Sequence, residues 1–254
     1  MGLLNNRVIL ITGTSSGIGR ASAIRCAAEG AIVVATSRRE ERGSLLVDEI
    51  QSSGGKARFI RADLSDPNSL DELFALVSND YGRLDGAFNN AGIRGNPHAV
   101  ADFPVGEFDA VFDTNVRGTW LCMRHEMKMM RQQGHGAIVN TSSIAGLVAV
   151  PDSSVYVAAK HAVIGMTKAA SLDAAALPIR VNCIAPGVVY SEMLEEWLQG
   201  LPEADRDPGK ILPIPMKRAG NPEEIASLAV WLLSDETSYM TGAVVVADGG
   251  LTVS

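Results

Sequence analysis

Short apolar runs alternate along this chain with longer helical stretches, and this order constrains the fold more than any other feature. Most runs are apolar at consecutive positions, which is typical of strands covered on both faces, as in a parallel sheet. The seven expected strands span residues 8–12, 32–36, 57–62, 84–90, 136–143, 179–185 and 243–248. The expected helices span residues 17–29, 39–53, 67–80, 104–132, 153–176 and 222–234. This order predicts an α/β fold, an open doubly wound parallel sheet with helices on both faces.

The chain has 254 residues, of which 46% are hydrophobic, and this is enough for one large domain with a sizeable core. No linker rich in Pro, Gly or Ser and no internal repeat divides it. We therefore expect a single domain over residues 1–254. Residues 190–218 interrupt the alternation of strands and helices, because they contain four prolines and no clear strand. A long excursion of this kind is a candidate substrate lid.

Charge and composition exclude several functions. The formal net charge is −7 and no basic stripe is present, so we expect no nucleic-acid partner. No apolar run approaches the roughly 18 residues of a membrane span, and the N-terminal residues lack the pattern of a secretory signal peptide. Cys26, Cys122 and Cys183 are far apart in the sequence and odd in number, which favours buried free thiols. These features predict a cytoplasmic protein that binds no membrane.

The first expected strand runs into Thr12-Gly13-Thr14-Ser15-Ser16-Gly17-Ile18-Gly19, and a helix follows. Glycines between a strand and a helix let the backbone approach a ligand closely, and the helix N-terminus offers free N–H groups to phosphate. The spacing is TGxxxGxG rather than GxGxxG. Alone, this stretch is consistent with an ordinary turn or with a phosphate site. In a doubly wound sheet the second interpretation corresponds to a Rossmann-type dinucleotide site.

The end of the second strand bears on the choice of cofactor. A dinucleotide site usually has an acidic residue there, which binds the ribose 2′-hydroxyl. Here that position holds Ser37, followed by Arg38 and Arg39. Serine can donate to a 2′-phosphate and a guanidinium can bind it through two hydrogen bonds, although solvated arginines beside a serine would tolerate either cofactor. The missing carboxylate favours NADP(H) over NAD(H). After the third strand, Asp63 could accept a hydrogen bond from the adenine amino group, since Asp66 is placed to cap the next helix.

Further motifs follow in order along the chain. They are Asn89-Asn90-Ala91-Gly92 after the fourth strand, Asn115 in NVRG, Ser143 in NTSS, Tyr156 and Lys160 in YVAAK, Pro186-Gly187, and Asp248-Gly249-Gly250. Together with the glycine turn, they resemble the soluble branch of the short-chain dehydrogenase/reductase family, over nearly the whole chain. The cofactor-binding residues that the turn, the strand ends and the resemblance imply are Gly13, Ser15, Ser16, Gly17, Ile18, Gly19, Ser37, Arg38, Arg39, Asp63, Leu64, Asn90, Ala91, Gly92, Thr141, Tyr156, Lys160, Pro186, Gly187, Val189, Ser191 and Met193.

Four residues are the expected catalytic set. Tyr156 and Lys160 lie four apart on an expected helix, so they share one face, and a nearby ammonium favours the phenolate needed for general acid–base chemistry. Ser143 ends the fifth strand at the carboxyl edge of the sheet, where its hydroxyl could hold the substrate oxygen. By resemblance, Asn115 steadies a water that links Lys160 to solvent, and Lys160 holds the nicotinamide ribose. The four histidines have no metal-ligand spacing, so we expect no metal.

These features predict an NAD(P)-dependent oxidoreductase that interconverts a small-molecule secondary alcohol and a ketone by hydride transfer, with Tyr156 as general acid and base. The loop at residues 93–98 and the 190–218 excursion are expected to line the substrate pocket. An alternative is a 3-oxoacyl-[acyl-carrier-protein] reductase, which would need a basic dock for its acidic partner, against the net charge of −7. A cofactor-sensing binding protein is the non-enzyme alternative, and it should have lost Tyr156 or Lys160. The resemblance also implies a homo-oligomer, often a tetramer.

Overall fold

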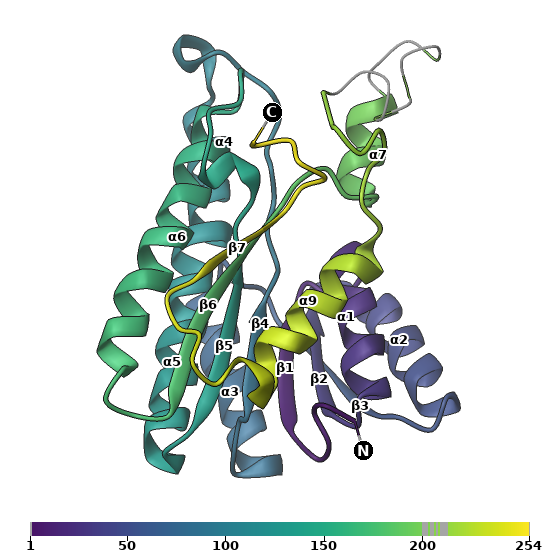
Figure 1. The fold of residues 1–254 in the computed structure, drawn as a ribbon, viewed down its shortest axis with the longest axis vertical. Coiled ribbons are helices and arrows are strands. Elements are labelled where there is room, and N and C mark those ends of the chain that lie inside the picture. Colours follow the sequence, from purple (N-terminus) through teal and green to yellow (C-terminus); the bar gives the residue numbers. More distant parts are fainter. Residues whose placement is uncertain (1, 200–202, 204–205, 207, 209–212, 254) are drawn as a thin grey trace.

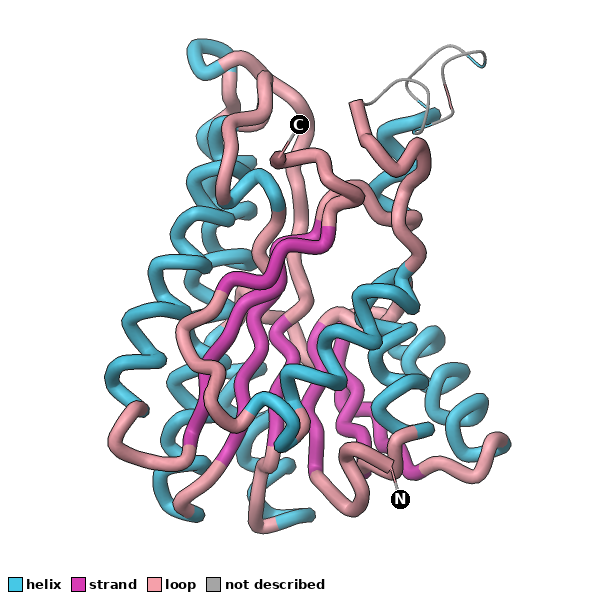
Figure 2. Tube along the Cα trace, viewed as in Figure 1, coloured by secondary structure: helices cyan, strands magenta, loops and turns pink. Residues whose placement is uncertain are grey.

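The computed structural model describes residues 2–199, 203, 206, 208 and 213–253. Within them, seven strands form one parallel sheet in the order β3-β2-β1-β4-β5-β6-β7 (Figures 1 and 2). The strands are β1 (Val8–Thr12), β2 (Ile32–Ser37), β3 (Lys56–Arg61), β4 (Gly86–Asn89), β5 (Gly136–Thr141), β6 (Ile179–Pro186) and β7 (Val244–Ala247). The predicted α/β fold, a Rossmann-type doubly wound seven-stranded sheet, is confirmed.

The sheet reverses its direction of growth at β1. The chain first builds outward through β2 and β3, then returns to place β4 on the other side of β1 and continues outward to β7. Ile9 of β1 is therefore in register with Val33 of β2 on one side and with Gly86 of β4 on the other. In open α/β sheets, ligands bind outside the carboxyl ends of the strands at such a reversal. The ends of β1 and β4 thus indicate where the site lies.

Helices cover both faces of the sheet (Figure 1). They are α1 (Gly17–Ala28), α2 (Glu40–Ser52), α3 (Pro67–Tyr81), α4 (Val105–Phe112), α5 (Thr119–Gln133), α6 (Ser154–Ala174), α7 (Glu192–Gln199) and α9 (Pro222–Leu233). The hydrophobic cluster on one face includes Cys26 of α1 and Leu233 of α9. The cluster on the other face includes Leu70 of α3 and Met130 of α5. No described helix is long and apolar enough to cross a membrane.

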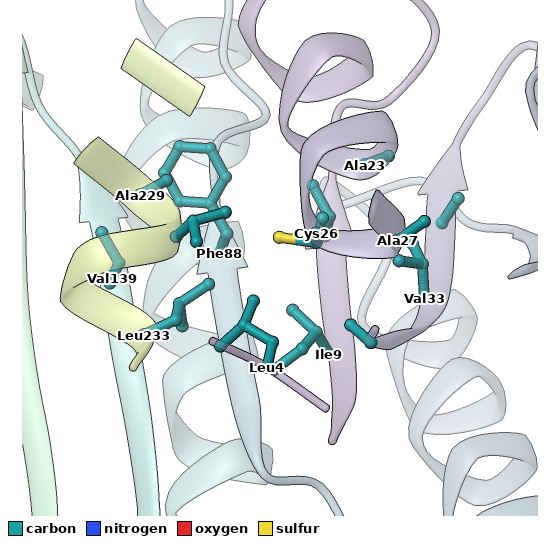
Figure 3. Packing of buried hydrophobic residues seen from close by; sticks show 14 of the residues in the cluster. Leu4, Ile9, Ala23, Cys26, Ala27, Val33, Phe88, Val139, Ala229 and Leu233 are labelled. Carbon is teal, nitrogen blue, oxygen red and sulfur yellow. The ribbon is translucent and has the colours of Figure 1, made fainter. Parts of the chain in front are cut away.

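The consecutive apolar residues of the strands follow from these two clusters. Neighbouring residues of a strand point to opposite faces of the sheet, so Ile9 joins the first cluster and Leu10 the second. Figure 3 shows the first cluster, where Ile9 and Phe88 of the sheet pack with Cys26 and Leu233. Cys26, Cys122 and Cys183 are all free and buried, as expected.

The helix expected over residues 104–132 is wrong in one respect, because the structure divides it into three parts. A π-helical segment, η2 (Asp113–Gly118), separates α4 from α5, and it contains Asn115. The apolar periodicity runs through this segment without a Gly or Pro signal before Gly118, so nothing in the pattern marked it. Single π-helical turns inside α-helices occur frequently at functional sites.

The segment expected as an irregular lid contains a helix that the sequence analysis missed. Helix α7 covers Glu192–Gln199, although the following prolines suggested a loop. Residues 200–202, 204–205, 207 and 209–212 of the expected lid lie outside the described residues.

A polar network lies buried under α5. Glu126 is fully buried, and its Oε2 accepts a hydrogen bond from Asn89 Nδ2 at 3.0 Å. Asn89 Nδ2 also donates to Asn140 Oδ1 at 3.0 Å. The other Glu126 oxygen, Oε1, has no partner among the described residues. Burial therefore raises the pKa of Glu126 to about 8, although the Asn89 hydrogen bond acts in the opposite direction. The folded protein thus holds a neutral carboxyl group at this position near neutral pH.

This carboxyl group makes stability depend on pH. The pKa of Glu126 is raised in the folded state above the usual 4.5, so the folded state binds the extra proton between these values. The free energy of unfolding should then fall as pH rises from about 5 to 8, by at most about 1.4 kcal/mol per pH unit from this group. Glu126→Gln should abolish that part of the slope. Urea unfolding at several pH values checks it, with exposed Glu41→Gln as the control. An unchanged slope in Glu126→Gln would contradict the assignment.

Candidate active site

The glycine turn lies at the reversal of the sheet and is closely packed. Gly13 and Gly17 have φ of +74° and +53°, a region that favours glycine. A Cβ on Gly13 would lie 2.8 Å from the Cα of Ala91, and one on Gly19 would lie 2.2 Å from the Gly13 carbonyl oxygen. The glycines of the turn therefore bring α1, β1 and the end of β4 together, which leaves the α1 N-terminus open to a ligand.

Thr12, which the sequence analysis did not select, ties this turn to β4. Its side chain is fully buried, and Oγ1 accepts hydrogen bonds from the backbone N–H groups of both Asn90 and Ala91 at 3.0 Å. Asn90 Nδ2 returns a hydrogen bond to the Thr12 carbonyl at 3.2 Å. A hydroxyl residue in the last position of an otherwise apolar strand is the signal that could have identified it.

The tip of β2 combines a buried hydroxyl with exposed arginines. Ser37 is 7% exposed, and its Oγ has no partner among the described residues. Arg38 is exposed and does not contact the glycine turn through any hydrogen bond described. Arg39 does so, since it donates to Ser15 Oγ at 2.6 Å and to Ser16 Oγ at 3.1 Å. A free hydroxyl and a guanidinium that reaches the glycine turn fit a cofactor with an anionic group at this position.

Of the two acidic residues after β3, Asp66 caps the next helix as expected. Asp66 Oδ1 accepts from the Asn68 N–H at 3.0 Å and caps α3. Asp63 Oδ1 accepts from the amide and hydroxyl of Ser65, at 3.0 and 2.7 Å. Burial acts to raise the pKa of Asp63, but the Ser65 hydrogen bonds and the nearby arginines lower it overall. Asp63 is thus a fixed, ionised acceptor. Leu64 beside it is buried at 5% exposure.

Tyr156 and Lys160 lie near each other on α6. The Lys160 Nζ is 5.6 Å from the centre of the Tyr156 ring. Lys160 is only 4% exposed, and Nζ donates to the Thr141 carbonyl at the end of β5, at 2.9 Å. The Lys160 carbonyl in turn accepts from the Ser142 hydroxyl at 2.8 Å. A buried cation is therefore held beside the phenol, where it stabilises negative charge.

Asn115 approaches the same lysine from the π-helical segment. Its side chain pairs fully with the backbone of Ile93, where Oδ1 accepts from the N–H at 2.8 Å and Nδ2 donates to the carbonyl at 2.7 Å. A Cβ on Gly92 would lie 3.1 Å from Asn115 Oδ1 and 3.5 Å from Lys160 Nζ. The absence of a side chain at Gly92 lets the two polar groups face a common space.

Ser143 lies just beyond the end of β5, but its side chain makes its hydrogen bond outside the Tyr156–Lys160 pair. It follows β5 and caps a short 3₁₀ helix, η3 (Ile144–Gly146), because its Oγ accepts from the Ala145 N–H at 3.1 Å. No contact between Ser143 and Tyr156 is described. The Ser143 hydroxyl hydrogen remains free for donation, since the Oγ serves Ala145 only as an acceptor. Thr141 Oγ1, two residues earlier, is buried without a partner among the described residues.

The loop after β6 closes over the glycine turn. The N–H of Gly187, after Pro186, donates to Ala247 of β7 at 2.9 Å, and Val189 forms an isolated bridge with Gly220. Ser191 Oγ donates to the Val189 carbonyl at 3.2 Å. A Cβ on Gly17 would lie 3.4 Å from the Ser191 Cβ. Met193 belongs to α7 in its backbone, and its side chain lies outside the described residues.

Glu192, the first residue of α7, is a second residue that the sequence analysis missed. Its Oε2 accepts from Ser16 Oγ at 3.0 Å and pairs with Arg39 Nη1 at 2.9 Å, and its Oε1 pairs with Arg42. These partners lie about 150 or more residues away along the chain, so no local pattern marks the contact.

A doubly wound sheet with a glycine turn at its reversal is typical of dinucleotide-dependent oxidoreductases, and comparisons with known proteins agree. Residues 13–252 match the family model described as enoyl-(acyl carrier protein) reductase. The chain is 44% identical over 255 residues to the A-factor type gamma-butyrolactone 1'-reductase (1S-forming) of Streptomyces virginiae, covering 99% of this chain and 98% of that protein. It is 39% identical over 268 residues to a 3beta-hydroxysteroid dehydrogenase of Mediterraneibacter gnavus, covering 99% and 97%.

A crystal structure of levodione reductase has a TM-score of 0.95 with this structure at 36% identity, and the match covers 99% of both chains. The chain belongs to the short-chain dehydrogenase/reductase family. It is accordingly an NAD(P)-dependent oxidoreductase of the type that acts on CH–OH groups.

The junction at Thr12 should be important for stability and for cofactor affinity. Thr12→Val keeps the size of the side chain but leaves the N–H groups of Asn90 and Ala91 without their acceptor. We expect a loss of about 1–3 kcal/mol in the free energy of unfolding and weaker cofactor binding, measured by urea unfolding and calorimetry. Thr12→Ser keeps the hydroxyl and should retain most of both. Equal stability of the Val variant and the parent would disprove the role of this junction.

Proposed function

We propose that this enzyme interconverts a ketone and a secondary alcohol, prefers NADP(H) to NAD(H), and uses Tyr156 as its general acid and base. The observation that carries the proposal is the buried Lys160 ammonium beside the Tyr156 ring, at 5.6 Å from its centre. It lies at the carboxyl edge of the sheet, next to the glycine turn. Tyrosine is among the side chains that act as general acid and base, and a cation beside it can stabilise the charge that develops in the transition state.

The cofactor, when bound, supplies or accepts the hydride. In the reduction, Tyr156 donates its proton to the carbonyl oxygen as that oxygen gains charge, and in the oxidation it takes the proton back. Ser143 donates a hydrogen bond to the same oxygen and orients it toward Tyr156. Lys160 stabilises the phenolate and binds the nicotinamide ribose. Asn115 fixes the loop at Ile93 and shares with Lys160 the space through which a water connects the proton to solvent.

The preference for NADP(H) rests on the tip of β2. A carboxylate at Ser37 would repel a 2′-phosphate, and none is present there. The unpartnered Ser37 hydroxyl and the Arg39 guanidinium can donate to such a phosphate. The remaining cofactor contacts follow the expected set: the glycine turn for the pyrophosphate, Asp63 and Leu64 for the adenine, Asn90 to Gly92 along the centre, and the loop from Pro186 to Met193 for the nicotinamide.

The substrate that we propose is a small cyclic ketone or alcohol. The named relatives are a butyrolactone reductase and a steroid dehydrogenase, and a levodione reductase has the same fold. An apolar cluster that includes Val111, Val155 and Phe103 packs against the part of α6 that carries Tyr156, and these apolar surroundings support an apolar ring as substrate. The acyl-carrier-protein alternative needs a basic dock. Arg131 of α5 could contribute to such a dock, but it already donates to the Asp173 carbonyl.

We also propose a cytoplasmic homo-oligomer, as the family resemblance implies. Exposed aromatic side chains on the outer helices support it, since Trp120 is 50% exposed and Phe108 is 42% exposed and stacks on Phe112. Beside them is a hollow of about 430 Å³, lined by Phe112, Trp120 and Met166 among others. The three free cysteines are consistent with a reducing compartment.

The first test concerns Tyr156. Tyr156→Phe should keep the fold and the cofactor affinity but lose at least about 10²-fold in kcat on a cyclic ketone, because phenylalanine cannot supply the proton. Tyr239→Phe, at a fully exposed position, is the matched control and should keep its activity. A Phe variant at position 156 with near-normal kcat would remove Tyr156 from the mechanism.

The second test concerns Ser37. Ser37→Asp should shift the ratio of kcat/KM for NADPH and NADH toward NADH by about 10-fold or more, because the carboxylate repels the phosphate and accepts from the 2′-hydroxyl. Ser37→Asn has a side chain of similar size without the charge and controls for the change in volume. Equal use of the two cofactors by the parent, or no shift in the Asp variant, would defeat the preference for NADP(H).

A further inference from the structure

The Glu192 carboxylate lies against the cationic groups at the mouth of the glycine turn. It joins three separate segments: Ser16 of the turn, the start of α2 through Arg39 and Arg42, and its own helix α7. Figure 1 shows α7 beyond the carboxyl ends of the strands, where the chain returns from β6. Arg39 also donates to the hydroxyls of Ser15 and Ser16, so the guanidinium that holds Glu192 also forms part of the glycine turn's surroundings.

The carboxylate is charged wherever the protein is folded and active. The hydrogen bond from Arg42 contributes most in lowering the pKa of Glu192 to about 2, Arg39 and Ser16 act in the same direction, and burial opposes them. Protonation therefore cannot remove this anion near neutral pH. The carboxylate thus remains a charged partner for both arginines at this pH.

The contacts of Glu192 depend on its position in α7. Acidic residues favour the first turn of a helix in general, and α7 has two of them, Glu192 and Glu195. Glu195 is exposed, and no ion pair joins it to a described residue. Of these two, Glu192 is the one that reaches across to the turn. A hollow of about 360 Å³ lies beside the glycine turn, lined by Ser15, Ser16 and Arg42 among others, and gives a second anion room to approach Arg42.

We propose that Glu192 competes with the 2′-phosphate of NADP(H) for Arg39 and Arg42, and thereby limits how strongly the enzyme prefers NADP(H) to NAD(H). The proposal rests on the NADP(H) preference proposed above. Arg39 lies two residues beyond Ser37, at the strand tip that faces the adenosine ribose in doubly wound folds. A phosphate with nearly two negative charges and a carboxylate repel each other at one pair of guanidiniums, so Glu192 must leave when NADP(H) binds.

NAD(H) places a neutral 2′-hydroxyl at the same position. A hydroxyl does not repel the carboxylate and does not need the arginines, so Glu192 can keep both ion pairs when NAD(H) binds. The loss of the ion pairs therefore weakens the binding of NADP(H) and not the binding of NAD(H). Glu192 is in this sense a residue that determines cofactor specificity, although it lies outside the tip of β2.

The test measures binding without turnover. Isothermal titration calorimetry gives the affinities of the parent, Glu192→Gln and Glu195→Gln for NADPH and NADH. It is repeated with 2′,5′-ADP and 5′-AMP, which carry only the adenosine end. Glu192→Gln should bind NADPH and 2′,5′-ADP about 3- to 10-fold more tightly, the scale expected for exposed ion pairs, and should change NADH and 5′-AMP by less than about 2-fold. Glu195→Gln, with the same change of charge in the same helix, should change none of them.

Three results would overturn the inference. They are unchanged NADPH affinity in Glu192→Gln, equal tightening of NADPH and NADH, and weaker NADH binding, which would make Glu192 an acceptor for the ribose. The two proposals fail separately. The ratio of the two affinities in the parent tests the NADP(H) preference, whereas the change of that ratio in Glu192→Gln tests the competition.

Discussion

The hydrogen bonds at Thr12 Oγ1 join the ends of β1 and β4, where the sheet reverses its strand order. The whole site depends on this junction. At the carboxyl ends of β1 and β4, the chain leaves in two directions, toward α1 and toward the loop at residues 90–98. Because one hydroxyl accepts from the N–H groups of both Asn90 and Ala91, the two segments diverge from a fixed point. Gly13 and Gly19 then allow the backbones to touch, since a Cβ at either position would overlap the other segments. Gly13, Gly19 and the Thr12 hydroxyl thus determine the shape of the dinucleotide site.

The part of the site around Tyr156 depends on a buried cation, the Lys160 ammonium. Lys160 enters the region between α6 and β5 with little exposure, and the Thr141 carbonyl accepts one of its protons. A buried ammonium is costly unless it is paired, and only part of its donor capacity is satisfied by that carbonyl. The remaining capacity points to the groups around it, which include the Tyr156 ring and the space at Gly92. The incomplete satisfaction of Lys160 supports the role that we propose for it.

The sequence was sufficient to predict the sheet, and it also selected the site residues that we propose, because both selections depend on local signals. Consecutive apolar residues marked the strands, and glycines, asparagines and the Tyr156–Lys160 spacing marked their ends. The π-helical turn at Asn115 was not predictable, since the apolar pattern continues through it and the turn depends on the pairing of Asn115 with Ile93. Helix α7 and the contacts of Glu192 were missed for a different reason, because a carboxylate there gains its partners only after the chain has folded. Arg38 and Arg39 looked equivalent in sequence, and only the fold turns Arg39 toward Ser15.

A site that binds an anion gathers positive charges, and these repel one another when no ligand is bound. Arg39 and Arg42 lie close to the N-terminus of α1, whose own partial charge is positive, and their mutual repulsion would favour displacement of the β2–α2 connection. Glu192 neutralises this cluster and connects α7 to the rest of the domain. By linkage, whatever stabilises the state without cofactor weakens the apparent affinity of the cofactor by the same free energy. In the competition that we propose, order in the site without cofactor and affinity for a 2′-phosphate are therefore opposed, and Glu192 links the two.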